Sequence, residues 1–210
     1  MSLYLMVLSL NCQNIEGKKV VVIDPGHGGI DSGAEGINGI QEKDIVLSIA
    51  KEMVRLNANT KSDFEIYLTR YEDTLISLSD RTRLAKTLKA DLFISLHCNK
   101  SENLKARGVE VYVNAKGGNF LKESVLLAYA LQKQMKTKLG FESRGVKFGN
   151  FQVLRETINY CPAFLVELGF LSNWDENRAL ISKEGQNVIA IELLKLIQLI
   201  NSFNKNKFRD

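Results

Sequence analysis

The chain has few cysteines, no long apolar run and no block of basic residues, and each absence narrows its class. The three cysteines, Cys12, Cys98 and Cys161, form an odd set without C-x-x-C spacing, so neither a disulfide framework nor a cysteine zinc ribbon is indicated. No segment reaches the roughly 20 apolar residues of a membrane-spanning helix. The net charge of +4, from 28 basic and 24 acidic residues, comes without Lys/Arg clusters, so no nucleic-acid partner is expected.

Several motifs of known enzyme classes are also missing. There is no H-E-x-x-H helix, no phosphate-binding P-loop, no G-x-S-x-G nucleophile elbow and no dinucleotide-binding glycine fingerprint. Cys98 is the only thiol beside a histidine. Because consecutive side chains of a strand point to opposite faces, we expect Cys98 to be a small core residue and not a nucleophile.

The first residues are typical of a leader or an extension. The run from Leu3 to Leu10 has the apolar character of a signal-peptide core but lacks its positive leading end. Cys12 follows this run as a lipid-attachment cysteine would, although the residue before it is not small. We expect a leader-like or extension segment at 1–17, the folded domain at 18–203 and a polar tail at 204–210. An N-terminal strand and lipid attachment at Cys12 are the alternatives for the first segment.

The rest of the chain alternates between strand and helix patterns. Apolar or β-branched runs predict strands at Lys19 to Asp24, Glu65 to Thr69, Asp91 to His97, Gly108 to Val113, Phe151 to Leu154 and Ala163 to Leu168. Helical spacing predicts helices starting near Gln41, around Leu78 to Leu88, from Glu123 to Leu139, and along a C-terminal stripe of Ile189, Leu193, Leu196, Ile197 and Ile200. The strand at Gly108 to Val113 alternates as a more exposed strand does.

This alternation predicts the fold class. The length of 210 residues and the 45% apolar fraction suit one domain with one core. We expect a single α/β domain with a mostly parallel twisted sheet of about six strands and helices on both faces. In such folds the reactive site lies at the carboxyl ends of the strands.

The only two histidines follow two of the predicted buried strands. His27 stands in DPGHGG and His97 in FISLHCN. If those strands are neighbours, both imidazoles reach the same edge of the sheet and can share one ion. Glu42, fifteen residues after His27 at the start of a predicted helix, is the third candidate ligand. Two histidines and one carboxylate leave a coordination position open, as catalytic zinc sites do. The alternative for Glu42 is a carboxylate favoured at a helix N-terminus by the helix dipole.

Glu167 is an acidic residue in the apolar strand sequence AFLVELGF. Such a residue is costly to bury unless it has a partner or a function. Near a metal site it could accept a proton from the attacking water and pass it to a leaving nitrogen. The alternative is a structural pairing with Arg155 or a backbone cap. Because Gly169 and Phe170 follow at once, we favour a position at the end of the strand.

Five segments together resemble the zinc-dependent N-acetylmuramoyl-L-alanine amidase family of cell-wall hydrolases. They are VVIDPGHGGIDSGAEG, QEKDIVLSIA, DLFISLHCN, RGVKFGNFQVLRET and PAFLVELGFLSN, and their order and spacing match over about Lys18 to Asn201. The resemblance implies that His27, Glu42 and His97 bind one zinc ion and that Glu167 is the catalytic glutamate.

The resemblance also implies the reaction and the location. The expected substrate is peptidoglycan or a muropeptide, cleaved at the amide between N-acetylmuramic acid and L-alanine, so we expect a place in the cell envelope, periplasmic or secreted. Some members carry a helical insertion that plugs the zinc site. The stretch from Ser101 to Gly140 is long enough for only one strand and one helix, so no autoinhibitory helix is expected.

Two other functions and two further contacts remain to be considered. A zinc carboxypeptidase would suit the same sheet and ligand set but needs a carboxylate-binding arginine deep in its pocket. A catalytically inactive wall-binding domain would usually have lost a ligand or the catalytic glutamate, and none is lost here. Asn99 and Arg155 lie in loops expected near the same edge, and we name them as candidate substrate-binding residues.

Overall fold

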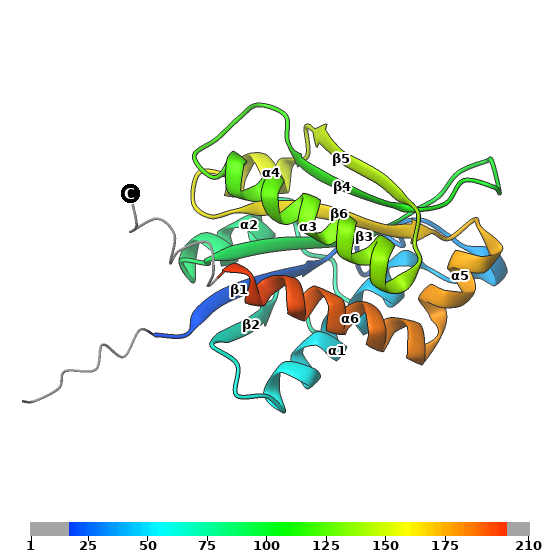
Figure 1. Ribbon diagram of the computed structural model, residues 1–210, viewed down its shortest axis with the longest axis horizontal. Coiled ribbons are helices and arrows are strands. Elements are labelled where there is room, and N and C mark those ends of the chain that lie inside the picture. Colours follow the sequence, from blue (N-terminus) through cyan, green and yellow to red (C-terminus); the bar gives the residue numbers. More distant parts are fainter. Residues whose placement is uncertain (1–16, 201–210) are drawn as a thin grey trace, which may run out of the picture.

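Six strands form one sheet in the order β2-β1-β3-β6-β4-β5 in the computed structural model, which describes residues 17–200 (Figure 1). The strands are β1 (Lys19–Pro25), β2 (Phe64–Leu68), β3 (Leu92–Asn99), β4 (Val109–Asn114), β5 (Ser143–Gly149) and β6 (Ala163–Phe170). Four neighbouring pairs are parallel, and β4 with β6 is the antiparallel pair. The predicted mostly parallel sheet of six strands is therefore confirmed.

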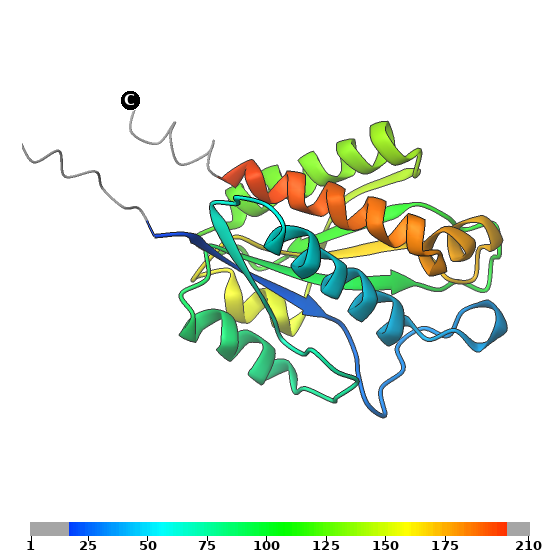
Figure 2. The ribbon, with the colours of Figure 1, turned by 90° about the horizontal axis from the view of Figure 1, so that it is seen from below.

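Helices cover both faces of the sheet. They are α1 (Glu42–Ala58), α2 (Leu78–Thr87), α3 (Leu121–Leu139), α4 (Gln152–Thr157), α5 (Trp174–Ile181) and α6 (Lys183–Gln198), and a short 3-10 turn, η1, spans Ile37–Gly39. Figure 2 shows α1, α3 and α6 together on one side of the strands, with α2 and α4 on the other side. The predicted coverage of both faces is confirmed, with one more helix in the C-terminal region than expected.

Each central strand supplies alternate side chains to two apolar cores. In β3, Leu92, Ile94 and Leu96 face the core beneath α1, α3 and α6, whereas Phe93 faces the core beneath α2 and α4. The side chains of β1 and β6 alternate in the same way. Burial on both faces explains why these strands read as continuous apolar runs in the sequence. Ser95 and His97 follow Phe93 on the α2 and α4 side of β3, and this alternation fixes the face on which the site lies.

One predicted strand was wrong, and one strand of the sheet was not predicted. The segment Phe151 to Leu154 is not a strand, because α4 begins at Gln152 and buries Val153 and Leu154 against the sheet. A four-residue apolar run fits either structure, so its periodicity cannot decide. The strand before it, β5, lies at the sheet edge, and none of its seven residues is buried. Its sequence lacks the alternation of apolar residues that would have predicted a strand.

The expected exposure of β4 was also wrong. β4 is buried at five of its six positions because it lies between β6 and β5. The helix predictions were more accurate: α3 ends at Gly140, which adopts the left-handed conformation with φ 72°. The C-terminal apolar stripe forms the buried face of α6 and extends to Ile200.

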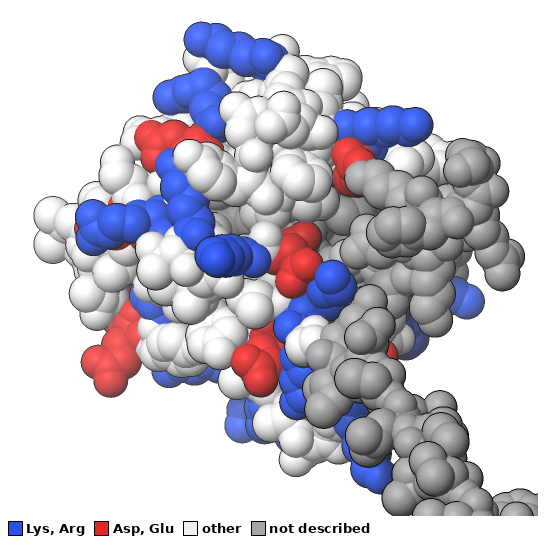
Figure 3. All heavy atoms as spheres, turned by 90° about the vertical axis from the view of Figure 1, so that its left-hand side faces the viewer, with Lys and Arg blue, Asp and Glu red and all other residues white. Residues whose placement is uncertain are grey.

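The chain ends carry predictions that lie outside the described residues: the leader-like segment, lipid attachment at Cys12 and the polar tail at 204–210. Among residues 17–200, no helix combines the length and the apolar character needed to cross a bilayer. On the side of the molecule where β1 begins, Lys and Arg side chains are scattered among acidic and uncharged residues (Figure 3).

The central position of β6 generates a stability prediction. Phe164 is fully buried in the core beneath α1, α3 and α6. Replacing it by alanine should lower the free energy of unfolding by about 3 to 5 kcal/mol, because it removes buried apolar surface and leaves a cavity. Urea denaturation followed by circular dichroism measures the change. Tyr129→Ala is the control, since Tyr129 on α3 is 64% exposed. Equal losses in the two variants would contradict the description of this core.

Candidate metal centre

His27 lies in the loop that follows β1, and its backbone conformation is unusual. Its φ angle is 58°, in the left-handed region that few residues other than glycine adopt. Two glycines with positive φ follow it directly. The backbone N–H of Gly26 donates to the carbonyl of Leu96 at 3.0 Å, so the start of the loop is tied to β3. The conformation of His27 turns the chain back at the carboxyl edge of the sheet.

His97 lies near the end of β3, which neighbours β1 as the sequence interpretation requires. Its side chain is 18% exposed, whereas Cys98 is 2% exposed in the core on the other face of the sheet. Burial raises the pKa of the Cys98 thiol well above its usual value. The expected alternation is confirmed, and Cys98 has no thiolate character that a nucleophile would need.

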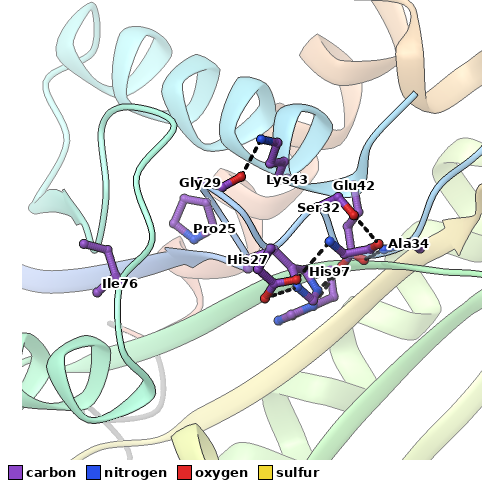
Figure 4. Close-up of polar contacts among 12 residues, drawn as sticks. Pro25, His27, Gly29, Ser32, Ala34, Glu42, Lys43, Ile76 and His97 are labelled. Carbon is purple, nitrogen blue, oxygen red and sulfur yellow. Dashed lines mark hydrogen bonds and ion pairs between the residues drawn. The ribbon is translucent and has the colours of Figure 1, made fainter. Parts of the chain in front are cut away.

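Glu42 is the residue at which the two histidines meet. It opens α1, and its Oε1 lies 3.2 Å from Nε2 of His27 and 2.9 Å from Nδ1 of His97. Potential ligand atoms of the three residues all lie within 4.8 Å of one another. Figure 4 shows the three side chains pointing toward one another from the loop, α1 and β3. The structure therefore brings together the three residues that the sequence predicts as metal ligands.

Backbone groups hold the carboxylate of Glu42 in place. Oε2 accepts a hydrogen bond from the N–H of Ala34 at 2.7 Å, and Oε1 accepts one from the N–H of Cys98 at 2.9 Å. The carboxylate is only 4% exposed. Its position at a helix N-terminus is also favourable for a negative charge, so the structural role of Glu42 is compatible with a role as a metal ligand.

Asp31 lies behind His27 and was missed by the sequence analysis. Its Oδ2 lies 2.8 Å from Nδ1 of His27. A carboxylate at this nitrogen fixes the tautomer that leaves the other nitrogen, Nε2, free to bind a metal. The signal in the sequence was the spacing of four residues between His27 and Asp31, which is too common to be informative alone.

The charges of the site are strongly coupled. Burial alone would lower the pKa of His27, but contacts with Glu42 and Asp31 raise it to about 9. Burial alone would raise the pKa of Glu42, but hydrogen bonds from His27 and His97 lower it to about 2. The carboxylates thus create a site that favours a positive charge between the three side chains.

Two glycines allow the ligands to approach. A Cβ atom on Gly26 would lie 2.3 Å from Cε1 of the His97 ring, and one on Gly33 would lie 2.5 Å from Oε2 of Glu42 and 2.6 Å from Cδ2 of His27. All three distances are far shorter than the contacts that real Cβ atoms make. The glycines at these positions are therefore required by the packing of the ligand side chains, which the sequence alone does not show.

Glu167 lies directly beside His97. The two residues are partners in the parallel register of β3 and β6, so their side chains share one face of the sheet. Glu167 is the fifth of eight residues in β6, which places it farther from the strand end than expected. Its Oε2 is buried without a hydrogen-bond partner among the described residues, and burial raises its pKa to about 7.

The other two candidate residues differ in position. Asn99 lines the cavity at the site, and its Nδ2 donates to Oε2 of Glu110 at 3.4 Å. Arg155 is not among the residues that line this cavity within the described chain. Its Nη1 donates to the carbonyl and the side-chain oxygen of Asn150, so Arg155 is not the structural partner of Glu167. The role of Arg155 as a substrate-binding residue stays a prediction.

A cavity of about 910 Å³ opens in front of these side chains. His27, Glu42, His97 and Glu167 all lie in its wall. It extends between the loop at 75–78 and the start of α4, where leucine, isoleucine, phenylalanine and valine side chains form an apolar wall. The size suits a ligand larger than a single amino acid.

Comparison with known proteins places the chain in a family. A sequence model of N-acetylmuramoyl-L-alanine amidase matches residues 21–198. The chain belongs to this amidase family. The solved N-acetylmuramoyl-L-alanine amidase of Clostridium difficile 630 superposes with a TM-score of 0.81 at 34% identity, over 89% of this chain and 98% of that one. The family match thus extends to the whole fold.

Two curated relatives are longer than this chain. A protein of Bacillus anthracis described as an uncharacterized cell wall amidase is 38% identical over 81% of this chain and 33% of its own length. The endolysin of Bacillus phage SPP1 is 40% identical over 79% of this chain and 59% of its own length. The chain thus spans about a third and about three fifths of these relatives.

The close approach at Gly26 generates the first prediction for the centre. Gly26→Ala should weaken zinc binding by about 10- to 100-fold, the range expected when support of a metal ligand is disturbed, because the new methyl group displaces the His97 ring. Competition with a chromophoric chelator measures the affinity. Gly17→Ala is the matched control, since a Cβ there meets nothing within 4 Å. Unchanged affinity in Gly26→Ala would contradict the assignment of His97 as a ligand.

The raised pKa of Glu167 generates a second prediction. Because its pKa of about 7 in the folded protein lies above the ordinary 4.5, ionising Glu167 destabilises the fold, and this cost develops as the pH rises from 4.5 through 7. Glu167→Gln removes it. We compare the unfolding free energies of the metal-free variant and the metal-free parent. The difference in favour of the variant should be larger at pH 8 than at pH 5 by about 2 to 3 kcal/mol. Urea denaturation at both pH values measures this, and a pH-independent difference would contradict it.

Proposed function

We propose that this chain is a zinc-dependent amidase that hydrolyses the bond between N-acetylmuramic acid and L-alanine in peptidoglycan. The convergence of His27, Glu42 and His97 at one point, with Glu167 beside them, is the observation that carries the proposal. Membership of the N-acetylmuramoyl-L-alanine amidase family supplies the substrate class. We place the protein in the cell envelope, periplasmic or secreted, where that substrate lies.

The donor set fits one zinc ion per chain. Two imidazole nitrogens and one carboxylate oxygen are ligands that zinc prefers, and three protein ligands leave one position for substrate or water. When bound, zinc would acidify a water molecule and polarise the carbonyl of the scissile amide. His27, Glu42 and His97 would hold the ion, and Asp31 would orient the His27 ring through Nδ1.

Glu167 is proposed to carry the proton. A carboxylate with a pKa of about 7 can both accept a proton from the attacking water and donate it to the leaving nitrogen near neutral pH. No hydrogen bond occupies Oε2 in the described structure, so this oxygen is available to the reacting groups. Asn99, which lines the same cavity, is proposed to hold an amide of the substrate.

The cavity does not favour the carboxypeptidase alternative. Such an enzyme needs an arginine whose guanidinium faces the pocket. Of the described residues that line the cavity, the one arginine is Arg81. Its nitrogens donate to Asp24 and to the carbonyls of Pro25 and His27, which leaves it committed to the protein.

No residue between 101 and 140 lines the described cavity. This segment contains β4 and α3, and α3 packs on β4, β5 and α6. We therefore propose that substrate reaches the site without displacement of a helix from this segment.

The proposal predicts which bond is cut and what the reaction needs. Zinc-loaded protein incubated with purified muropeptides should release the intact stem peptide and leave a free lactyl group on the muramic acid, as measured by mass spectrometry of the products. A chelator should abolish the reaction, and added zinc should restore it. Release of single amino acids would support the peptidase instead.

A Glu167→Gln variant separates an enzyme from an inactive wall-binding domain. This variant should retain zinc, since Glu167 is not proposed as a ligand, and should lose activity by at least about 100-fold, as expected when a general acid–base group is removed. Binding of intact sacculi without any cleavage by the zinc-loaded parent would favour the binding domain and reject the proposed reaction.

A further inference from the structure

Two arginines of the described chain are almost completely buried, and both contact the loop that carries His27. Arg70 follows β2, and Arg81 lies in α2; each is 3% exposed. A buried guanidinium is costly unless its donors are satisfied. The groups that satisfy these donors therefore indicate what the two residues do.

Arg81 reaches the loop from the α2 side of the sheet. Its Nη1 donates to Oδ1 of Asp24 at 2.8 Å and to the carbonyl of Pro25 at 2.7 Å. Its Nη2 donates to the carbonyl of His27 itself at 2.7 Å, and its Nε donates to the carbonyl of Ile76 at 3.2 Å. One side chain thus connects the end of β1, the candidate ligand and the loop before α2.

Arg70 connects the segments of two candidate ligands. Its Nη2 donates to the carbonyl of Gly26 at 2.9 Å and to that of Lys43 at 2.8 Å. Gly26 directly precedes His27, and Lys43 directly follows Glu42. Its Nε also donates to the carbonyl of Pro25 at 3.1 Å. A single nitrogen therefore joins the neighbours of His27 and Glu42.

The loop needs such support because its conformation is unfavourable in isolation. A residue other than glycine held at φ 58° costs of order 1 to 3 kcal/mol and persists only where the surroundings enforce it. The carbonyls of Pro25, Gly26 and His27 all accept hydrogen bonds from the two arginines. Farther along the loop, the carbonyl of Gly29 accepts a hydrogen bond from Nζ of Lys43 in α1 at 2.8 Å (Figure 4).

The arrangement is expensive as a purely structural device. Burial lowers the pKa of Arg70, and the nearby charge of Arg81 lowers it further, so two cations are held close together in a buried place. Of the hydrogen bonds described for the two guanidinium groups, only the one to Asp24 involves a carboxylate. Residues without a buried charge could close an ordinary loop at a lower cost in folding free energy. The planar guanidinium holds its N–H donors in a fixed geometry, which suits a loop whose backbone must keep a candidate ligand in one position.

We propose that Arg70 and Arg81 are positioning residues of the metal centre. They hold the left-handed backbone at His27 and fix its distance from Glu42, and they thereby set the zinc affinity of the site. The inference rests on the proposed zinc site and deepens it. Neither arginine contacts the side chain of a candidate ligand, so both would act through the backbone that carries His27 and Glu42.

The test uses lysine substitutions, which keep the charge but lose the forked donors. Zinc affinity of the full chain is measured by competition with a chromophoric chelator for Arg70→Lys and Arg81→Lys. Each variant should bind zinc about 10- to 100-fold more weakly, as expected when groups that orient a metal ligand are changed. Arg83→Lys is the matched control, because Arg83 lies in the same helix with its side chain 74% exposed, and it should bind as the parent does.

Thermal unfolding with and without zinc separates positioning from general stability. If the arginines position His27, the rise in melting temperature on adding zinc should shrink in both variants, because that rise depends on affinity. If they only stabilise the fold, both melting temperatures fall together while the rise and the affinity stay as in the parent, and the inference is overturned. Arg70→Lys leaves the pair of Arg81 and Asp24 intact, so it decides the matter should Arg81→Lys not fold. A parent that binds no zinc would instead reject the proposed function.

Discussion

The carboxylate of Glu42 is the contact on which the site depends. Both imidazoles approach its Oε1, and backbone N–H groups of Ala34 and Cys98 hold its two oxygens. Through this one group, the loop after β1, the first turn of α1 and the end of β3 are fixed relative to one another. A buried anion with two neighbouring imidazoles favours a cation at their centre, and this is the physical reason why three distant segments form a candidate metal centre.

The guanidinium groups of the buried arginines are committed to groups other than Glu42 and Glu167. Arg81 lies in the cavity wall, but its guanidinium is committed to Asp24 and backbone carbonyls. A guanidinium facing the cavity would compete with a metal for Glu42 and Glu167. By binding carbonyl oxygens of the loop, the arginines can support His27 without neutralising the carboxylates in front of it.

The sequence reveals those parts of the molecule whose side chains repeat or converge in a regular way. Doubly buried strands such as β3 read as continuous apolar runs, and strand alternation places His97 and Cys98 on opposite faces. The edge strand β5 and the short helix α4 were not predicted, because an exposed strand and a four-residue apolar run have no distinctive period. Strands of this sheet are thus predictable from the sequence where both of their faces are buried.

The supporting residues of the site were not predictable for a different reason. Asp31 contacts a histidine nitrogen four residues away, and Arg70 and Arg81 contact backbone carbonyls up to 56 residues away in the sequence. Such contacts depend on the loop conformation, which follows from positive φ angles that a sequence pattern does not specify. The candidate ligands could be named because their chemistry limits the choice, since the chain has only two histidines.

Two glutamates on the same face of the sheet have pKa values that their surroundings shift in opposite directions. Glu110 and Glu167 are register partners in β4 and β6. Although burial opposes it, contacts from Lys147, Arg144 and Tyr112 lower the pKa of Glu110, so this carboxylate stays ionised and committed. Glu167 forms no ion pair with a Lys or Arg of the described residues, and burial raises its pKa to about 7 although the nearby His97 opposes the rise. Of two adjacent carboxylates, only Glu167 is thus able to exchange a proton near neutral pH, and it is the one that lies beside the candidate metal ligands.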